Sequence, residues 1–244
     1  MRIGIYIGSF NPPHLGHKKV IDYLLENNYV DKVLIVPTQN YWNKNNLIDI
    51  NDRINMLKFY ESDNIKVDDI HNNYQYTYEL LRELKIFYQN DILYLVIGSD
   101  NLKDLHKWKN IEELLKYNII VLRRNKIIKN DKIDDTNFIY VDDYPYIDIS
   151  STEIRNGDYK YLDNKIKKYI IDNKLYLSYL NNNIKTKISE LDVNKIIDIH
   201  NDEVYYLVED TLYKYDLKYG ETKIMKYEEW KDNNQNSIII YNEK

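Results

Sequence analysis

Two histidines three residues apart, His14 and His17, are the side chains whose type and spacing point most clearly to chemistry. They lie in the segment Gly8-Ser9-Phe10-Asn11-Pro12-Pro13-His14-Leu15-Gly16-His17, between the apolar run Arg2–Ile7 and an amphipathic stretch over residues 15–27. Side chains three apart share one face of a helical turn. A helix N-terminus also presents unpaired N–H groups and a partial positive charge. The strand, the turn and the helix start together predict a phosphate-binding site.

A second helix start with polar side chains stands in Ile149-Ser150-Ser151-Thr152-Glu153-Ile154-Arg155. Ser150 and Glu153 have the spacing of a capping box, and Ser151 and Arg155, four residues apart, share a face. Taken alone, this segment is explained by an ordinary cap beside a surface arginine. With the two histidines upstream, we interpret it as a second phosphate site, and a bound triphosphate needs such a pair.

Apolar segments without polar alternation recur between amphipathic segments up to about residue 175. The expected strands are Arg2–Ile7, Lys32–Val36, Ile65–Asp69, Ile92–Ile97, Ile119–Leu122 and Phe138–Val141. The expected helices are Leu15–Asn27, a helix capped by Asn51 that runs to about Ser62, Tyr78–Ile86, Ile111–Tyr117, and two that begin near Ser150 and Lys165. This pattern predicts an α/β fold with a doubly wound, Rossmann-like parallel sheet.

Ligands in such sheets bind beyond the carboxyl ends of the strands, where the strand order switches. Three segments follow expected strand ends, namely Gly8–His17, Pro37–Lys44 and Gly98–Asn101. We therefore expect them to converge on one crevice.

The alternation of strands and helices stops near residue 180. Beyond the asparagine-rich segment 181–183, short apolar runs separated by turn residues predict a small antiparallel meander. Its expected strands are Ile196–Ile199, Val204–Val208, Leu212–Leu217, Thr222–Met225 and Ser237–Tyr241. We expect two domains, an α/β domain over residues 1–178 and a small β-meander domain over residues 184–244.

Composition limits the classes of function that remain open. The 244 residues carry a net charge of −5, which argues against a nucleic-acid polymer as the partner. The chain has no cysteine, which excludes disulfides, thiolate catalysis and cysteine-ligated zinc, and which fits a cytoplasmic location. No apolar run approaches the roughly 18 residues of a membrane span. The sequence does not reveal the oligomeric state, and a homo-oligomer stays open.

Taken together, the motifs resemble those of bacterial nicotinate (nicotinamide) mononucleotide adenylyltransferases, within the nucleotidyltransferases that carry His-x-Gly-His. The resemblance covers about residues 1–178 and rests on the two end motifs, with Tyr76-Thr77-Tyr78-Glu79, Ile97-Gly98-Ser99-Asp100 and Lys107-Trp108 between them in the family's order. It implies transfer of AMP from ATP to a pyridine mononucleotide. The mononucleotide itself supplies the nucleophile, so that positioning and charge stabilisation carry the catalysis.

The resemblance also implies roles for single residues. His14 and His17 would hold the triphosphate, with His17 stabilising the charge at the α-phosphorus, and Arg155 would hold the β- and γ-phosphates together with Ile149, Ser150 and Ser151 at the second helix start. The remaining implied contacts are Gly98 and Asp100 for adenosine, Gly8, Ser9 and Phe10 for the wall between the substrates, Thr77 and Trp108 for the pyridine, and Lys44 for a phosphate. Mg²⁺ would arrive mainly on the phosphates of ATP, without a dedicated metal site in the protein.

Several alternatives stay open at this point. The loop after the second strand lacks the histidine that the family usually has beside Lys44, which puts the role of Lys44 in doubt. Trp108 could be a core residue, and Arg123-Arg124 could be either solvated or bound to phosphate. Rival functions are a phosphopantetheine adenylyltransferase or a cytidylyltransferase, and a protein that senses nucleotides or acts as a scaffold without turnover. The sequence does not decide between the nicotinate and the nicotinamide substrate.

Overall fold

The computed structural model describes residues 1–39, 47–124, 133–155, 159–173 and 175–176, and the strands 195–200, 203–208, 211–216 and 222–225. The chain divides into two compact units. The first comprises Met1–Ile154 with Lys160–Leu175, and the second Arg155–Tyr159 with Tyr176–Lys244. The domain boundary at residue 178 stays a prediction.

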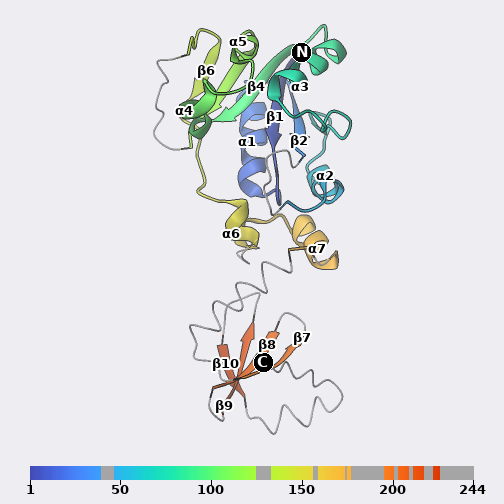
Figure 1. Cartoon of the computed structure of the whole chain (residues 1–244), viewed down its shortest axis with the longest axis vertical. Coiled ribbons are helices and arrows are strands. Elements are labelled where there is room, and N and C mark those ends of the chain that lie inside the picture. The colour runs from blue at the N-terminus through green and yellow to red at the C-terminus, as the bar shows by residue number, and fades with distance from the viewer. Residues whose placement is uncertain are drawn as a thin grey trace. The chain divides into compact units, whose positions relative to one another are not determined.

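The first unit contains a six-stranded sheet in the order β3-β2-β1-β4-β5-β6, and every neighbouring pair is parallel (Figure 1). Its strands are β1 (Arg2–Gly8), β2 (Lys32–Pro37), β3 (Ile65–Val67), β4 (Ile92–Gly98), β5 (Asn118–Leu122) and β6 (Phe138–Val141). The expected α/β fold with a parallel sheet is confirmed. The order switches between β1 and β4, which opens a crevice beyond their carboxyl ends.

Helices connect the strands from β1 to β5, and two further helices follow β6. They are α1 (Leu15–Glu26), α2 (Ile50–Lys58), α3 (Thr77–Phe87), α4 (Leu102–Leu105), α5 (Ile111–Leu114), α6 (Ser151–Arg155) and α7 (Asn164–Asp172), with short 3₁₀ turns η1 (Ser99–Asn101) and η2 (Tyr159–Tyr161). A hydrophobic cluster joins Ile3 and Ile5 of β1 to leucines of α3, α4 and α5. Full burial of one such side chain contributes about 1.5–3 kcal/mol, so this packing fixes the strand ends that bear the site.

Three of the expected helix limits were wrong. Helix α2 ends at Lys58, whereas the sequence predicted a helix as far as about Ser62. The cap of α2 is Asp49 and not Asn51, because the carboxylate of Asp49 accepts the N–H of Asn51 at 2.7 Å. An acidic side chain at this position satisfies an N–H that the helix leaves unpaired. Helix α5 ends at Leu114, whereas the sequence predicted a helix as far as Tyr117.

The second unit contains a four-stranded antiparallel sheet in the order β10-β9-β8-β7. Its strands are β7 (Lys195–His200), β8 (Glu203–Val208), β9 (Thr211–Asp216) and β10 (Thr222–Met225). Sequential neighbours pair, so that the meander predicted for these residues is confirmed. The expected strand Ser237–Tyr241 and the expected linker at 181–183 lie outside the described residues.

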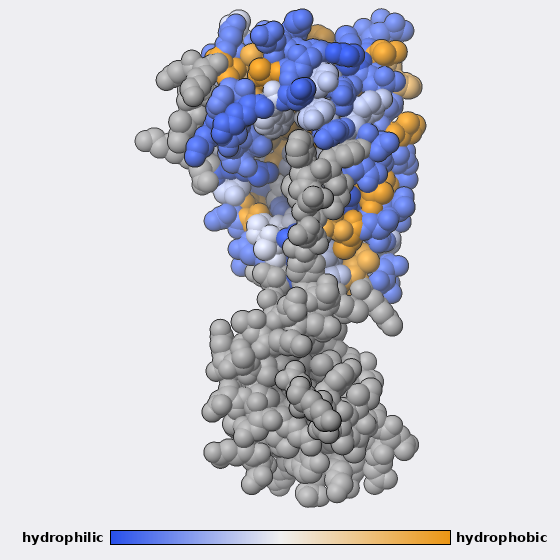
Figure 2. Space-filling model, viewed as in Figure 1, coloured by the Kyte–Doolittle hydropathy of each residue, from blue (hydrophilic) through white to orange (hydrophobic). Residues whose placement is uncertain are grey.

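Within the described part of the chain, the helices are all too short or too polar to cross a membrane. Figure 2 shows the described surface of the first unit as largely hydrophilic, with hydrophobic residues in small groups.

Candidate functional site

The first motif forms the turn from β1 into α1. His14 is the N-cap residue of α1, and His17 occupies the third position of the helix. Their imidazole rings stack, with centroids 3.7 Å apart and an interplanar angle of 29°. The structure therefore places both rings side by side at a helix N-terminus, as the three-residue spacing predicts.

The backbone fixes the tautomer of His17. The N–H of His14 donates to Nδ1 of His17 at 3.1 Å, so that in the neutral ring the proton is on Nε2. Burial, then His14 and Arg124, lower the pKa of His17 well below its ordinary value. At neutral pH the ring is thus an uncharged donor whose other nitrogen is already used by the backbone.

His14 has an unsatisfied nitrogen. Its side chain is buried, and Nδ1 has no hydrogen-bond partner among the described residues. Burial lowers the pKa of His14 to about 4, with a further contribution from Arg124 and an opposing one from Glu153. Gly16 leaves room for this ring, since a Cβ there would lie 3.0 Å from Nδ1 of His14. A buried polar atom without a partner carries a cost, which a ligand oxygen at this position would relieve.

The second motif lies directly against the first. The hydroxyl of Ser151 donates to the carbonyl oxygen of Pro12 at 2.9 Å, across 139 residues of sequence. The side chain of Ile149 lies 3.7 Å from the position of a Cβ on Gly16. The capping box also forms, because the N–H of Ser150 donates to Glu153 at 2.7 Å and the N–H of Glu153 donates to the Ser150 hydroxyl at 3.2 Å. Helix α6 itself is a single short turn of five residues.

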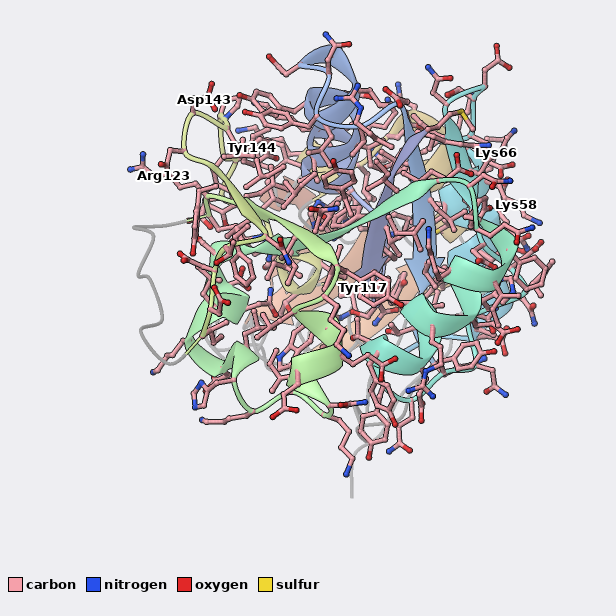
Figure 3. The ribbon with its side chains drawn as sticks, turned by 90° about the horizontal axis from the view of Figure 1, so that it is seen from above. Lys58, Lys66, Tyr117, Arg123, Asp143 and Tyr144 are labelled. Carbon is pink, nitrogen blue, oxygen red and sulfur yellow. The ribbon has the colours of Figure 1, made fainter. Side chains whose placement is uncertain are left out.

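An aromatic contact holds the segment before α6 against α1. Tyr144 is buried and meets Tyr23 of α1 edge to face, with ring centroids 5.3 Å apart. In Figure 3, Tyr144 lies with Asp143 and Arg123 on one side of the molecule, and Lys58 and Lys66 lie on the other. This contact explains how a segment that follows the edge strand β6 reaches the histidine turn.

Arg124 lies over the carboxyl end of β4. A Cβ on Gly98 would clash with the carboxylate of Asp100 and with Nε of Arg124, so that another residue there would force both side chains to move. Arg124 pairs with Asp100 at 3.4 Å, and its backbone N–H donates to the hydroxyl of Ser99 at 3.0 Å. The guanidinium lowers the pKa values of both histidines, which makes this end of the sheet attractive to anions.

Three cavities share lining residues and so form a row along the crevice. The first, of about 30 Å³, is lined by His14, His17 and Ile149. It shares Tyr6, Gly98 and Arg124 with a second cavity of about 110 Å³. The second shares Thr77 and Trp108 with a third of about 510 Å³. The row thus leads from the imidazoles, past Arg124, to the indole.

Trp108 combines the two roles that the sequence left open. It is partly buried and packs against the hydrophobic cluster of the first unit, and it also lines the second and third cavities. Thr77, the first residue of α3, lines the same two cavities. One face of the indole can therefore belong to the core while another meets a ligand.

The other predicted residues are placed as follows. Phe10 is only 2% exposed and packs edge to face on His17, with centroids 5.0 Å apart, so that it supports the imidazole from the interior. Gly8 makes this packing possible, because a Cβ there would lie 3.0 Å from the Phe10 ring. Arg155 is the last residue of α6. Lys44 lies outside the described residues.

Sequence reasoning missed two residues of this region. Tyr6 is buried, lines two of the cavities and meets Phe10 edge to face at 5.4 Å. Arg53 is 1% exposed and donates to the carbonyl oxygen of Ser9. A signal for Arg53 does exist, because this charged residue falls among the apolar positions Ile50, Ile54 and Leu57 of one helix face.

The fold and the two motifs are those of a nucleotidyltransferase, and residues 5–157 match the model of the Cytidylyltransferase-like family. A probable nicotinate-nucleotide adenylyltransferase of Fusobacterium nucleatum is 38% identical over 168 residues, which are 64% of this chain and 86% of that protein. One of Borreliella burgdorferi is 34% identical over 199 residues, 74% of this chain and 100% of that protein. The chain belongs to the nicotinate-nucleotide adenylyltransferase family.

Solved structures agree with this assignment. The Plasmodium falciparum nicotinic acid mononucleotide adenylyltransferase complexed with NaAD superimposes with a TM-score of 0.58 at 26% identity. The match covers 72% of this chain and 97% of that one. The same enzyme complexed with APC gives a TM-score of 0.56 at 25% identity, with 72% and 96% covered.

Proposed function

We propose that the chain transfers the AMP group of ATP to nicotinate mononucleotide, which yields the dinucleotide and pyrophosphate in NAD biosynthesis. The observation that carries the proposal is the row of cavities that runs from the stacked imidazoles to Trp108. One end offers hydrogen-bond donors to phosphates, and the other offers an aromatic face to a pyridine. Family membership supports the same reaction.

The substrates supply both reacting groups. The phosphate oxygen of the mononucleotide attacks the α-phosphorus, a new P–O bond forms, and the bond to pyrophosphate breaks. The chain would lower the barrier by positioning these groups and by donating hydrogen bonds where negative charge develops. We assign that role to Nε2–H of the neutral His17, and we assign phosphate binding to the unsatisfied nitrogen of His14.

The other residues would bind the substrates. Gly98 and Asp100 would bind adenosine. Ser9 and Arg124 would lie at the boundary between the two substrates. The β- and γ-phosphates would be bound by Ser150, Ser151 and Arg155. Lys44 remains a proposed phosphate contact. Asp100 would have to release Arg124 when ribose binds, since the two side chains are paired in this structure.

Mg²⁺ would enter on the phosphates of ATP and neutralise part of their charge. The side chains that line the first cavity are imidazoles, a guanidinium, tyrosines and aliphatic groups, which suit phosphate oxygens better than a bare metal ion. We expect the reaction in the cytoplasm, without a nucleic-acid or membrane partner, and a homo-oligomer stays open.

A panel assay of pyrophosphate release tests the proposal. ATP or CTP is paired with nicotinate mononucleotide, nicotinamide mononucleotide or phosphopantetheine, and kcat/KM is measured for each pair. We expect the highest value for ATP with nicotinate mononucleotide. Saturable ATP binding without pyrophosphate release would favour the sensing or scaffold alternative, and turnover with phosphopantetheine or CTP would favour another transferase.

Replacement of Trp108 by alanine should weaken binding of the mononucleotide and leave ATP binding nearly unchanged. A stack of a base on an aromatic side chain contributes roughly 1–3 kcal/mol, and we expect a pyridine stack of that order. Isothermal titration with each substrate measures the two affinities. Equal losses for both substrates would mean that Trp108 serves only the core.

A chain truncated after Ser178 should remain folded and active. The family model ends at residue 157, and the helix α7 that follows already packs on α2, where Tyr169 donates to Asp52 at 2.9 Å. The test measures the turnover of the truncated protein, and its mass by light scattering, and compares both with those of the full chain. A soluble but inactive fragment of unchanged oligomeric state would show that residues 184–244 contribute to the active site.

A further inference from the structure

A buried arginine in the middle of α2 connects several backbone segments. Arg53 is 1% exposed, and a buried charge is costly unless it is well hydrogen-bonded. Its Nη1 donates to the carbonyl oxygens of Ser9 and Thr38, each at 2.7 Å, and its Nε donates to that of Ile48 at 3.2 Å. One rigid guanidinium thus binds three separate carbonyl groups.

Two of these carbonyls belong to residues that directly follow the carboxyl ends of neighbouring strands. Ser9 follows β1 and lies within the histidine motif, and Thr38 follows the neighbouring strand β2. Thr38 and Ile48 also flank residues 40–46 on either side. Two further bonds join the same segments, since the N–H of Thr38 donates to Gly8 at 2.9 Å and the N–H of Ile48 donates to Oδ1 of Asn11 at 3.3 Å.

The histidine turn has a backbone shape that needs support. Phe10, directly after Ser9, has a φ of 45°, in the left-handed region that a residue with a Cβ rarely adopts. This conformation directs the Phe10 ring onto His17, where it packs at 5.0 Å. The Ser9 carbonyl that Arg53 binds belongs to the peptide bond between Ser9 and Phe10, and Phe10 supports the imidazole of His17.

We propose that Arg53 is a positioning residue for adenylyl transfer, which holds the Ser9–His14 turn in the shape that presents both imidazoles to ATP. The inference rests on the proposed function, because it takes the phosphates of ATP as the ligand of that turn. In this proposal Arg53 does not contact the substrates, and it affects the imidazoles only through Ser9 and Phe10. Lysine cannot replace it, because its single ammonium group lacks the planar fork that reaches carbonyls in different directions.

The test compares Arg53→Lys, Arg53→Met and Arg53→Ala with the parent chain and with Arg82→Met. Arg82 is the control, because it is an exposed helical arginine that pairs with Glu113 of α5 and donates to no carbonyl of the histidine turn. For each full-length protein, the unfolding midpoint is measured first. Then kcat and the Kd for ATP are measured at a temperature at which every variant is folded.

For Arg53→Lys we expect a kcat at least tenfold below the parent and a Kd for ATP at least threefold higher, because small misplacements of catalytic groups are costly. We expect Arg82→Met to match the parent in both. Millimolar guanidinium chloride should restore part of the kcat of Arg53→Ala, and the same concentration of potassium chloride should not.

A folded Arg53→Lys variant with parental kcat and parental Kd would overturn the proposal and show that Arg53 only stabilises the fold. If Arg53→Met and Arg53→Ala do not fold, the kcat and the Kd for ATP of Arg53→Lys still decide. The proposed function fails by a different result, namely that the parent chain itself releases no pyrophosphate. In that case the Kd for ATP of the folded variants still reports on the turn.

Discussion

Replacement of His17 by alanine should lower kcat at least about a hundredfold, the loss typical when one donor to a developing oxyanion is removed. In the neutral ring, Nε2–H is free to donate because Nδ1 accepts the N–H of His14. This donor would act mainly on the transition state, so that kcat should fall more than the affinity for ATP. Pyrophosphate release under saturating substrates measures the effect.

Two further substitutions separate catalysis from helix capping. Asparagine at position 17 can accept the N–H of His14 in place of Nδ1, but it has no group at the position of Nε2. Glutamine can place an amide donor near the position of Nε2. We therefore expect His17→Asn to remain stable and nearly inactive, and His17→Gln to retain more activity. Turnover of His17→Asn close to the parental value would refute the assigned role of the imidazole.

The sheet could be predicted because its strands are nearly continuous apolar runs. Residues such as Ile3, Ile5, Leu93 and Leu95 are covered on their side of the sheet by α3, α4 and α5, and the sequence shows this burial directly. The convergence of Gly8–His17 and Gly98–Asn101 could also be predicted, because carboxyl ends of parallel strands share one edge, whereas the second motif was paired with the first only because a triphosphate needs two sites. The bond between Ser151 and Pro12 shows that the two motifs meet.

Contacts made by single polar side chains could not be predicted in the same way. The pair of Arg124 with Asp100 depends on the absence of a Cβ at Gly98, and local spacing does not encode such a contact. The position of Arg53 among apolar residues of one helix face indicates burial, but the sequence does not show which three carbonyls it binds. The cap of α2 was misplaced for a simpler reason, since Asp49 and Asn51 are both good capping residues and only the geometry chooses between them.

The histidine turn should also make the first unit sensitive to acid. The pKa of His14 is lowered from 6.5 to about 4 in the folded chain, mainly by burial. Between these two values the unfolded chain binds a proton that the folded chain does not, so that stability is lost as the pH falls through this window. For one such histidine, the free energy of unfolding at pH 4.5 should be about 2.5 kcal/mol lower than at pH 7.5. His17 shifts in the same direction and adds to the loss.

The comparison of the parent with His14→Asn isolates this effect, because the two proteins share every titratable group except His14. Urea unfolding is followed by the fluorescence of Trp108, in a background in which Trp42 and Trp230 are replaced by phenylalanine, so that the signal reports on the first unit. Burial and Arg124 disfavour a charge on His14 and Glu153 favours it, and asparagine carries no charge at any pH. We expect the parent to lose about 2–3 kcal/mol more than His14→Asn between pH 7.5 and 4.5. Parallel curves for the two proteins would mean that the ring of His14 takes up its proton as readily in the folded chain as in the unfolded one, and that this site is open to water.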